Sequence, residues 1–403
     1  MFDPIKLHKD FPLLRETGKK TPIYFDNACS TLKPQSVIDS INQYYREYPV
    51  CGGRSNYRLA DMVTKKVEES RVAAAKFINA KKPNEIIFLK NTTEGINLVA
   101  RGLGLKQGDV VLTSDKEHNS NLIPWQILSE NIGVIHETIP SAPDNTFDLE
   151  ALKTRLNKKV KLVAIGTTSN LDGVSVPLAD IVKLAHKNGS LVLADAAQTI
   201  PHHPMDVQAL GVDFMAFSGH KMLGPSGTGI LYGKYDLFEN LEPLMTGGGT
   251  VEYSTYTKHA LLPTPAKFEA GLQDYAGIIA LKEAFDYLKD VGFKNITHQE
   301  TLMNQTITDA LKNIPGLTVI GPQDPVKRGG ILSFYVDGVD THQLSLMLDA
   351  RANIMIRSGR HCVHSWFEAH DVHSSARLSF YFYNTLEEAE KFIKVFKEIL
   401  TLF

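Results

Sequence analysis

The sequence predicts an α/β fold with a mainly parallel central sheet, helices on both faces, and a smaller α+β domain at the C-terminal end. Two observations carry this prediction. Short apolar runs alternate with helical patterns through the first part of the chain, and beyond about residue 280 fewer, longer helices surround separate strands. Alternation of strands with helices is typical of a parallel sheet, because each crossover between parallel strands needs a connecting helix.

The strands expected in the central sheet are short runs of apolar or β-branched residues. They lie at 85–89, 109–113, 162–166, 191–194, 214–217 and 229–232. One crossover helix can be delimited between the third and fourth of these runs. Pro177 suits its first turn, Leu178, Ile181 and Ala185 belong to its apolar stripe, and Gly189 ends it.

The C-terminal part has its own strands and a clear final helix. Strands are expected at 317–321, 330–336, 354–356 and 376–382. The last helix begins with the capping box Thr385 to Glu388 and carries Phe392 and Phe396 on its apolar face. We therefore expect three parts: an N-terminal segment over 1–20 that packs with the small domain, a large domain over 21–280, and a small α+β domain over 281–403.

Composition excludes several classes of protein. The 403 residues include 43 Lys and Arg against 45 Asp and Glu, so no overall basic surface favours nucleic acid or an anionic membrane. No apolar run approaches the roughly 18 residues of a membrane span, and the N-terminus does not resemble a signal peptide. We expect a cytoplasmic protein. Cys29, Cys51 and Cys362 form no CxxC pair, which excludes a disulfide framework and a four-thiolate metal site.

Polar residues follow five consecutive expected strands. These segments are 90–95, 114–119, 167–170, 195–198 and 218–221. Any one of them could be a helix cap or a turn, but ligands of open α/β sheets bind beyond the carboxyl ends of the strands. Thr92 and Thr93 at a helix start suit a phosphate group, with Ser218 and His220 as further donors. A phosphorylated cofactor fits this pattern.

The segment 219–224 has the glycine spacing of a nucleotide-binding P-loop but not its sequence. Pro225 and Ser226 stand where that motif requires Lys and Ser or Thr, and Lys221 lies inside the loop. The remaining pair is Lys221, which can form a Schiff base, and Asp195, which can hold a proton on a pyridine nitrogen. A pyridoxal phosphate enzyme needs this pairing.

Four motifs carry a resemblance to a known family. They are the run Phe217–Tyr232 (FSGHKMLGPSGTGILY), Asp195-Ala-Ala-Gln198, Thr92-Thr-Glu-Gly-Ile-Asn97 and Glu117-His118. The chain resembles the class V aminotransferase-fold enzymes over nearly its whole length, and within them the SufS-type (group II) cysteine desulfurases. The resemblance implies the pyridoxal phosphate-dependent transferase fold type I, with the cofactor in the large domain and a cysteine loop in the small one.

The resemblance also implies roles around the cofactor. Lys221 would carry pyridoxal 5'-phosphate and act as the base at the substrate's alpha carbon, while Asp195 would pair with the pyridinium nitrogen. His118 would stack on the ring and shuttle protons. The remaining cofactor contacts would come from Gln198 at the phenolic oxygen and from Thr92, Thr93, Ser218 and His220 at the phosphate.

Cys362 separates a desulfurase from an aminotransferase. It ends Arg357-Ser-Gly-Arg-His-Cys362, which resembles the family's Arg-x-Gly-x-His-Cys loop. In a desulfurase its thiolate takes the substrate's sulfur as a persulfide and L-alanine is released. Arg357, Arg360 and His361 would supply a positive setting that favours the thiolate. The resemblance makes Asn170, Arg357 and Arg377 the residues that bind the substrate, Arg377 as a bidentate fork on its carboxylate.

The other two cysteines are interpreted as packing residues, Cys29 near the site because it stands where the family normally has alanine. A metal site is the competing interpretation of the C-terminal cluster of His361, Cys362, His364, His370 and His373, but its spacing matches no standard zinc motif, so we expect no metal.

The prediction is a homodimeric cysteine desulfurase that acts on L-cysteine and passes sulfur to an acceptor or iron–sulfur scaffold protein, with neither nucleic acid nor membrane as partner. Three alternatives stay open. They are a lyase for L-selenocysteine, a related aminotransferase or lyase that does not use the thiol, and a catalytically silent relative.

Overall fold

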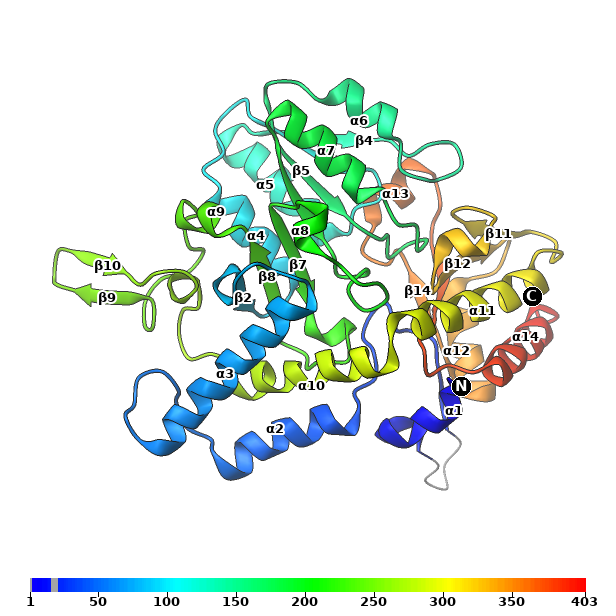
Figure 1. Cartoon of the computed structure of the whole chain (residues 1–403). Helices are drawn as coiled ribbons and strands as arrows, with labels where there is room; N and C mark the ends of the chain where they lie inside the picture. The colour runs from blue at the N-terminus through cyan, green and yellow to red at the C-terminus, as the bar shows by residue number, and fades with distance from the viewer. Residues whose placement is uncertain (1, 16–20) are drawn as a thin grey trace.

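The computed structural model describes residues 2–15 and 21–403, and its largest element is a seven-stranded sheet (Figure 1). The strand order is β2–β8–β7–β6–β5–β3–β4. Their bounds are β2 (Ile86–Leu89), β3 (Val110–Ser114), β4 (Ile135–Ile139), β5 (Val160–Gly166), β6 (Leu191–Asp195), β7 (Phe214–Ser218) and β8 (Gly229–Gly233). Only β8 runs against its neighbours among these described strands, which confirms the predicted mainly parallel sheet.

The six predicted strands lie within two residues of observed ones, whereas β4 was not predicted. Its sequence, Ile-His-Glu-Thr-Ile, lacks a continuous apolar run. The reason is its place at the edge of the sheet, where it pairs only with β3 and keeps much of its surface exposed. An edge strand needs less apolar surface than a strand that is buried on both faces.

Helices cover both faces of the central sheet, and alternate side chains of β5 pack into the cores on the two faces. Val163 and Ile165 join the core formed with α3 (Arg58–Phe77), α7 (Leu178–Asn188) and α10 (Tyr275–Val291). Leu162 and Ala164 join the opposite core, which contains α4 (Thr92–Gly102) and α5 (Ile123–Ile132). The remaining helices of this part are α2 (Gln35–Glu47), α6 (Leu149–Arg155), α8 (Val207–Leu210) and α9 (Tyr235–Glu239).

The predicted crossover helix is confirmed as α7. It ends at Gly189, whose φ of +83° is left-handed and suits glycine. Pro177 lies at the N-cap, one position before the predicted first turn.

A second, four-stranded antiparallel sheet follows in the order β11–β12–β15–β14. Its strands are β11 (Leu317–Ile320), β12 (Ile331–Val336), β14 (Arg357–Gly359) and β15 (Ser375–Ser379). Its core contains side chains of α11 (Phe293–Leu311), α12 (Thr341–Ala352) and α14 (Leu386–Leu400). The predicted strand over 354–356 is β13 (Ile354–Met355), which pairs instead with β1 (Ile23–Tyr24). β15 ends three residues before the prediction, and β14 was not predicted.

The capping box of α14 is confirmed. Thr385 Oγ1 accepts from Glu388 N (3.3 Å), and Glu388 Oε2 accepts from Thr385 N (3.1 Å). The predicted domain boundary near 280 falls inside α10 and stays a prediction, as does the placing of the segment 1–20, whose residues 1 and 16–20 lie outside the described residues. Phe11 of that segment packs against Tyr287 and Tyr383.

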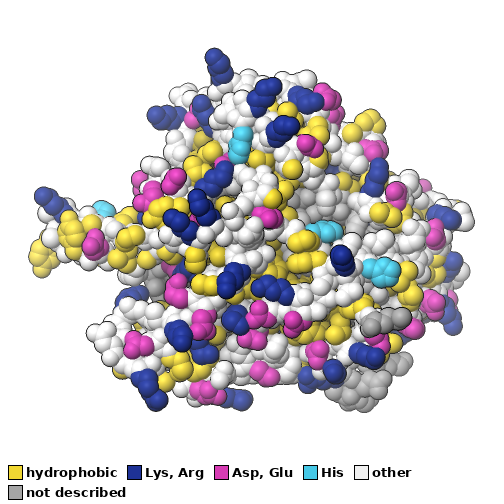
Figure 2. Space-filling model, in the orientation of Figure 1, with side chains coloured by type: hydrophobic (Ala, Val, Ile, Leu, Met, Phe, Trp, Pro, Cys, Tyr) yellow, Lys and Arg dark blue, Asp and Glu magenta, His cyan; other side chains and the backbone are white. Residues whose placement is uncertain are grey.

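A hairpin of β9 (Val251–Ser254) and β10 (His259–Leu261) projects from the side of the molecule (Figure 1). Figure 2 shows apolar side chains along this arm, where Tyr253 and Tyr256 are exposed. Within residues 2–15 and 21–403, no helix combines the length and apolar character that crossing a membrane requires.

Candidate active site

A cavity of about 280 Å³ lies at the carboxyl ends of the central strands. Its walls come from the large sheet, from the turn after β1 and from the loop after β14. Every site residue predicted from the sequence lines it: Thr92, Thr93, His118, Asn170, Asp195, Gln198, Ser218, His220, Lys221, Arg357, Cys362 and Arg377. The structure therefore brings the predicted set together, while the role of each residue stays a prediction.

Lys221 and Asp195 are placed by neighbouring parallel strands. Lys221 ends the 3-10 turn η5 (Gly219–Lys221) that directly follows β7, and a Cβ at Gly219 would lie 2.2 Å from Thr228 Oγ1, so this turn needs glycine. Asp195 ends β6 and accepts a hydrogen bond from Ala197 N (3.0 Å). Burial lowers the pKa of the Lys221 amine, and the nearby Asp195 carboxylate opposes this effect.

The first turn of α4 faces the same cavity. Ser218 Oγ accepts from Thr92 N (2.8 Å) and also bonds the Thr92 hydroxyl (2.7 Å). The hydroxyls of Thr93 and Ser120 bond each other at 2.7 Å. The backbone N–H groups and the dipole at the N-terminus of this eleven-residue helix favour an anion.

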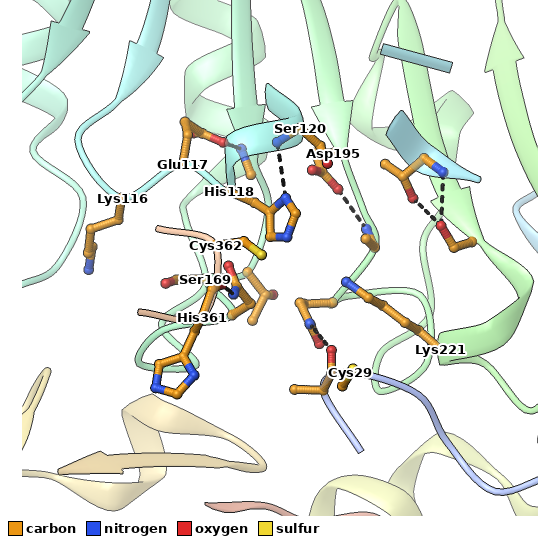
Figure 3. Close-up of a pocket in the computed structure, with 18 of the residues that line it drawn as sticks. Cys29, Lys116, Glu117, His118, Ser120, Ser169, Asp195, Lys221, His361 and Cys362 are labelled. Atoms are coloured by element: carbon orange, nitrogen blue, oxygen red, sulfur yellow. Dashed lines mark hydrogen bonds between the residues drawn. The ribbon is translucent and has the colours of Figure 1, made fainter. Parts of the chain in front are cut away.

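His118 follows β3 and is held in one tautomer. Its Nδ1 accepts from Ser120 N (3.1 Å), which places the ring proton on Nε2. Burial, with a smaller effect of the charges of Lys221 and Arg377, lowers the pKa of His118 to about 3. The ring is therefore neutral at physiological pH. Figure 3 shows His118, Lys221 and Cys362 around the same cavity.

Glu117 belongs to a motif noted in the sequence, but no role was predicted for it. Its carboxylate is buried and accepts from the Ser114 hydroxyl (2.6 Å), Asn121 Nδ2 (2.8 Å) and Gly166 N (3.0 Å). It thus ties the end of β3 to the end of β5 and fixes the backbone that carries His118. Burial raises the pKa of Glu117 to about 7. The sequence signal was a glutamate in the short polar segment 114–119 that follows an apolar strand.

Arg377 and Asn170 link the two sheets. Arg377, on β15, donates to Asn170 O (3.0 Å) and to Asp26 Oδ1 (3.2 Å). Its Nε is buried and has no hydrogen-bond partner among the described residues. Asn170 Nδ2 in turn donates to His361 O (2.7 Å). The arginine is therefore fixed by two bonds and retains a donor, and Asn170 connects it to the loop of Cys362.

Cys362 is exposed in a left-handed turn between β14 and α13 (His364–Ala369). The φ angles of His361 and Cys362 are +49° and +59°, a conformation that costs energy outside glycine. Asn119 N donates to Cys362 O (2.7 Å). On the far side, buried Val363 and Phe367 pack with Leu171 and Ile320. These contacts hold the strained turn in place.

The predicted positive setting of Cys362 is wrong in two of its three members. Burial lowers the pKa of His361 well below its usual range, so this ring is neutral. Arg360 forms an ion pair with Glu368 and also donates to His373 O. Of the three, Arg357 lines the cavity with a charged side chain, and Arg377 supplies a second charge there. The sequence placed three basic side chains together but could not show where each one points.

Two further expectations are settled by these contacts. The prediction that Cys29 lies near the site is confirmed, because Cys29 lines the cavity, whereas its interpretation as a packing residue is wrong, because it is exposed. The competing metal site fails because the side chains diverge: His361 bonds Ser375 (2.8 Å), His364 bonds Asn119 (3.0 Å) and His370 stacks on Trp366. Over the described ranges, no three His, Cys, Asp or Glu side chains converge as metal ligands.

Comparison with known proteins decides the family. Residues 23–392 match the model of the class-V aminotransferase family. The chain belongs to this family. It is 38% identical over 393 residues to a probable cysteine desulfurase of Halalkalibacterium halodurans, covering 96% of each chain.

Solved structures of the family agree. The apo structure of the cysteine desulfurase from Thermococcus onnurineus is 37% identical, with a TM-score of 0.95 and coverage of 100% of this chain and 99% of that one. The cysteine desulfurase CsdA from Escherichia coli is 31% identical, with a TM-score of 0.91 and the same coverage. The predicted family and fold type are confirmed, while the SufS-type subgroup stays a prediction.

Proposed function

We propose that this protein is a pyridoxal phosphate-dependent cysteine desulfurase that converts L-cysteine to L-alanine and keeps the sulfur as a persulfide on Cys362. The observation that carries the proposal is the exposed Cys362 thiol in the same cavity as Lys221 and Asp195. Family membership and 38% identity to a relative named a probable cysteine desulfurase support it.

The donor set of the cavity fits pyridoxal 5'-phosphate. Lys221 offers an amine, Asp195 a carboxylate, and the first turn of α4 with Ser218 and His220 an anion site. Gln198 donates to Ala28 O (2.8 Å), and its buried Oε1 lacks a partner within the described part of the chain, as expected of a group that faces a ligand. The bound cofactor would supply an electron sink for the substrate's alpha carbon.

The protein's own groups would position the substrate and move its protons. Arg377 retains a buried N–H for the substrate carboxylate, and Arg357 adds a second cation. The lowered pKa of Lys221 favours an uncharged amine, which can take a proton from the alpha carbon. His118 is neutral with its proton on Nε2, so it can give and regain a proton inside the cavity.

Cys362 would complete the reaction as the sulfur acceptor. In the net reaction its Sγ forms an S–S bond with the substrate sulfur and the substrate's C–S bond breaks. The proton released from the thiols ends on the carbon that becomes the methyl group of alanine. This step requires a thiolate, and the guanidinium groups of Arg357 and Arg377 line the same cavity as the thiol. The exposure of Cys362 would then let an acceptor or scaffold protein for iron–sulfur assembly collect the sulfur.

The proposal includes a homodimer. Figure 2 shows apolar side chains along the projecting β9–β10 hairpin, where Tyr253 and Tyr256 are exposed. Met245 and Leu272 are exposed in the two segments that the Gly271 N to Gly248 O hydrogen bond joins at the base of this hairpin. Such a surface on an extended arm favours association with a second subunit. Light scattering of the purified protein would test this, with dissociation expected for the double variant Y253S/Y256S.

The decisive experiment incubates the purified holoprotein with L-cysteine, quantifies alanine and maps persulfides by mass spectrometry. Alanine and a Cys362 persulfide are expected. Cys362→Ser should lose both while retaining the cofactor's absorption band, and the matched variant Cys51→Ser should retain both, because Cys51 lies elsewhere, against Gly52 and Tyr275. Undiminished alanine formation by Cys362→Ser would refute the persulfide route. L-selenocysteine in parallel would test the lyase alternative.

A further inference from the structure

We propose that Cys29 is a second sulfur acceptor inside the cavity, which takes the outer sulfur of a persulfide formed on Cys362. The inference rests on the proposed function, because Cys362 must be loaded first. Its starting point is that two of the three thiols of the chain are exposed and line one cavity, from opposite parts of the sequence. The proposed reaction uses only one of them.

The backbone on the Cys29 side is fixed. Cys29 N donates to Asp26 O (3.1 Å) in the turn after β1. On its N-terminal side, Ala28 N donates to Ser379 Oγ (2.9 Å), and Ala28 O accepts from Gln198 Nε2 (2.8 Å). The residue before Cys29 is therefore bonded through both its N–H and its C=O, which fixes the backbone that carries the Cys29 thiol.

The Cys362 turn is fixed on its own side by Asn170 and Asn119, as described above. Lys221 is the common neighbour of the two thiols: each lies near enough that its thiolate charge acts on the Lys221 amine. Figure 3 shows Cys362 to the left of the Lys221 side chain and Cys29 below it. Arg377 lies near Cys29 as well. Sulfur exchange proceeds through a thiolate, and the guanidinium groups of Arg357 and Arg377 line the cavity that both thiols share.

The transfer is balanced without an added oxidant or reductant. The Cys29 thiolate attacks the outer sulfur of Cys362–S–SH, a new S–S bond forms on Cys29, and the bond to Cys362 Sγ breaks. Cys362 leaves as a thiolate with the electron pair, and the outer sulfur keeps its proton. The outer sulfur of the persulfide lies about 2 Å beyond Cys362 Sγ. Cys29 Sγ can therefore reach this outer sulfur with less movement of the two backbones than a direct Cys29–Cys362 disulfide would need. The anchored backbones oppose that disulfide.

The loaded thiol would lie beside Gln198, which bonds the carbonyl of Ala28, the residue next to Cys29. Loading of Cys29 would restore Cys362 as a free thiolate, ready for a second substrate.

The test follows persulfides in time after L-cysteine is added to the holoprotein and then removed, with alkylation, digestion and mass spectrometry. We expect the Cys362 persulfide first and the Cys29 persulfide later, with bound sulfur approaching about two atoms per chain. Cys29→Ala should halve the bound sulfur, and Cys362→Ser should abolish it at both positions. Cys51→Ala is the matched control and should behave as the unaltered protein.

The outcomes separate this proposal from the proposed function. Alanine and a Cys362 persulfide without any sulfur on Cys29 would overturn the relay and leave the desulfurase intact. Sulfur on Cys29 in Cys362→Ser, or a Cys29–Cys362 disulfide in place of the second persulfide, would also overturn it. Absence of alanine and of every persulfide would instead refute the desulfurase.

A second measurement needs no turnover. A short bifunctional thiol cross-linker, added without L-cysteine, should join Cys29 to Cys362 and should leave Cys51 singly modified. The loss of the linked peptide in Cys29→Ala would support the juxtaposition. Failure of the unaltered, fully folded protein to form this link would overturn the proposal.

Discussion

The two walls of the cavity are built in different ways. Asp195 and Lys221 directly follow strands of a parallel sheet, and the pairing of those strands fixes where each backbone ends. Cys362 instead occupies a left-handed turn after a three-residue strand, and side-chain contacts hold it there. The first wall surrounds its charged groups with protein, whereas the second exposes its thiol.

This difference matches two chemical needs. Groups that exchange protons with the substrate need shifted pKa values, and burial at strand ends provides them, as it does for His118 and Lys221. A thiol that passes sulfur to an acceptor must be accessible to that acceptor, and a position at a buried strand end is not accessible. Removing a group from each wall in turn should therefore have different consequences.

Lys221→Ala removes the amine from the first wall of the cavity, the one built at the strand ends, and should have the largest effect on activity. We expect loss of the cofactor's visible absorption band and a fall in alanine formation of at least about 10²–10⁴-fold, because the variant lacks the only amine proposed to hold the cofactor and move the alpha proton. Absorption spectra and alanine release would measure this. The exposed Lys90→Ala should be unchanged, and substantial turnover by Lys221→Ala would contradict the assignment.

Glu117→Gln tests how the stability of the first wall of the cavity, built at the strand ends, depends on pH. The folded pKa of Glu117 is raised to about 7, above its unfolded value, so its stabilising contribution is complete below the unfolded pKa and is lost as pH rises through about 7. The contribution of Glu117 to the free energy of unfolding should fall by about 3 kcal/mol over this pH range. Urea unfolding of the cofactor-free protein between about pH 5 and 8 should show this slope, and the variant should lack it.

Exposed Glu398→Gln is the matched control for that series and should keep the slope of the unaltered protein. The same slope in Glu117→Gln would show that another group causes it.

Asn170→Ala leaves His361 O without its hydrogen-bond donor in the second wall, the loop that carries Cys362. Loss of this bond should destabilise the loop by about 1–3 kcal/mol. Persulfide formation should fall about tenfold, while alkylation of Cys362 by iodoacetamide should not slow. Asn119→Ala is the control, since its backbone N–H still bonds Cys362 O. Equal losses in both variants would mean that the His361 contact does not position the thiol.

The smallest expected effect is a difference in the rate of Cys362 alkylation between variants of two arginines of its loop. Arg357 lines the cavity, whereas Arg360 is paired with Glu368. Arg357→Gln should slow alkylation of Cys362 about two- to fivefold, the effect of a partly exposed charge, and Arg360→Gln should leave the rate unchanged. A slower rate in Arg360→Gln alone would reverse our assignment of the positive setting.

Much of this arrangement could be predicted from the sequence, because strands buried on both faces leave continuous apolar runs. The runs at 162–166 and 214–217 located β5 and β7, and the polar residues after them located the site. The edge strand β4 left no such run. The left-handed turn at Cys362 also went unpredicted, since a positive φ is uncommon at a cysteine and one preceding histidine does not indicate it.

The sequence by itself determined the alternation of strands and helices, the family, and the identity of the groups that meet in the cavity. Periodicity and motif spacing are local properties, so they can be read along the chain. Only the tertiary structure decided that His361 is neutral, that Arg360 is paired away from the site, that Glu117 ties β3 to β5, and that Cys29 opens onto the same cavity as Cys362. Charge state and exposure depend on neighbours far away in the sequence, and folding alone brings those neighbours together.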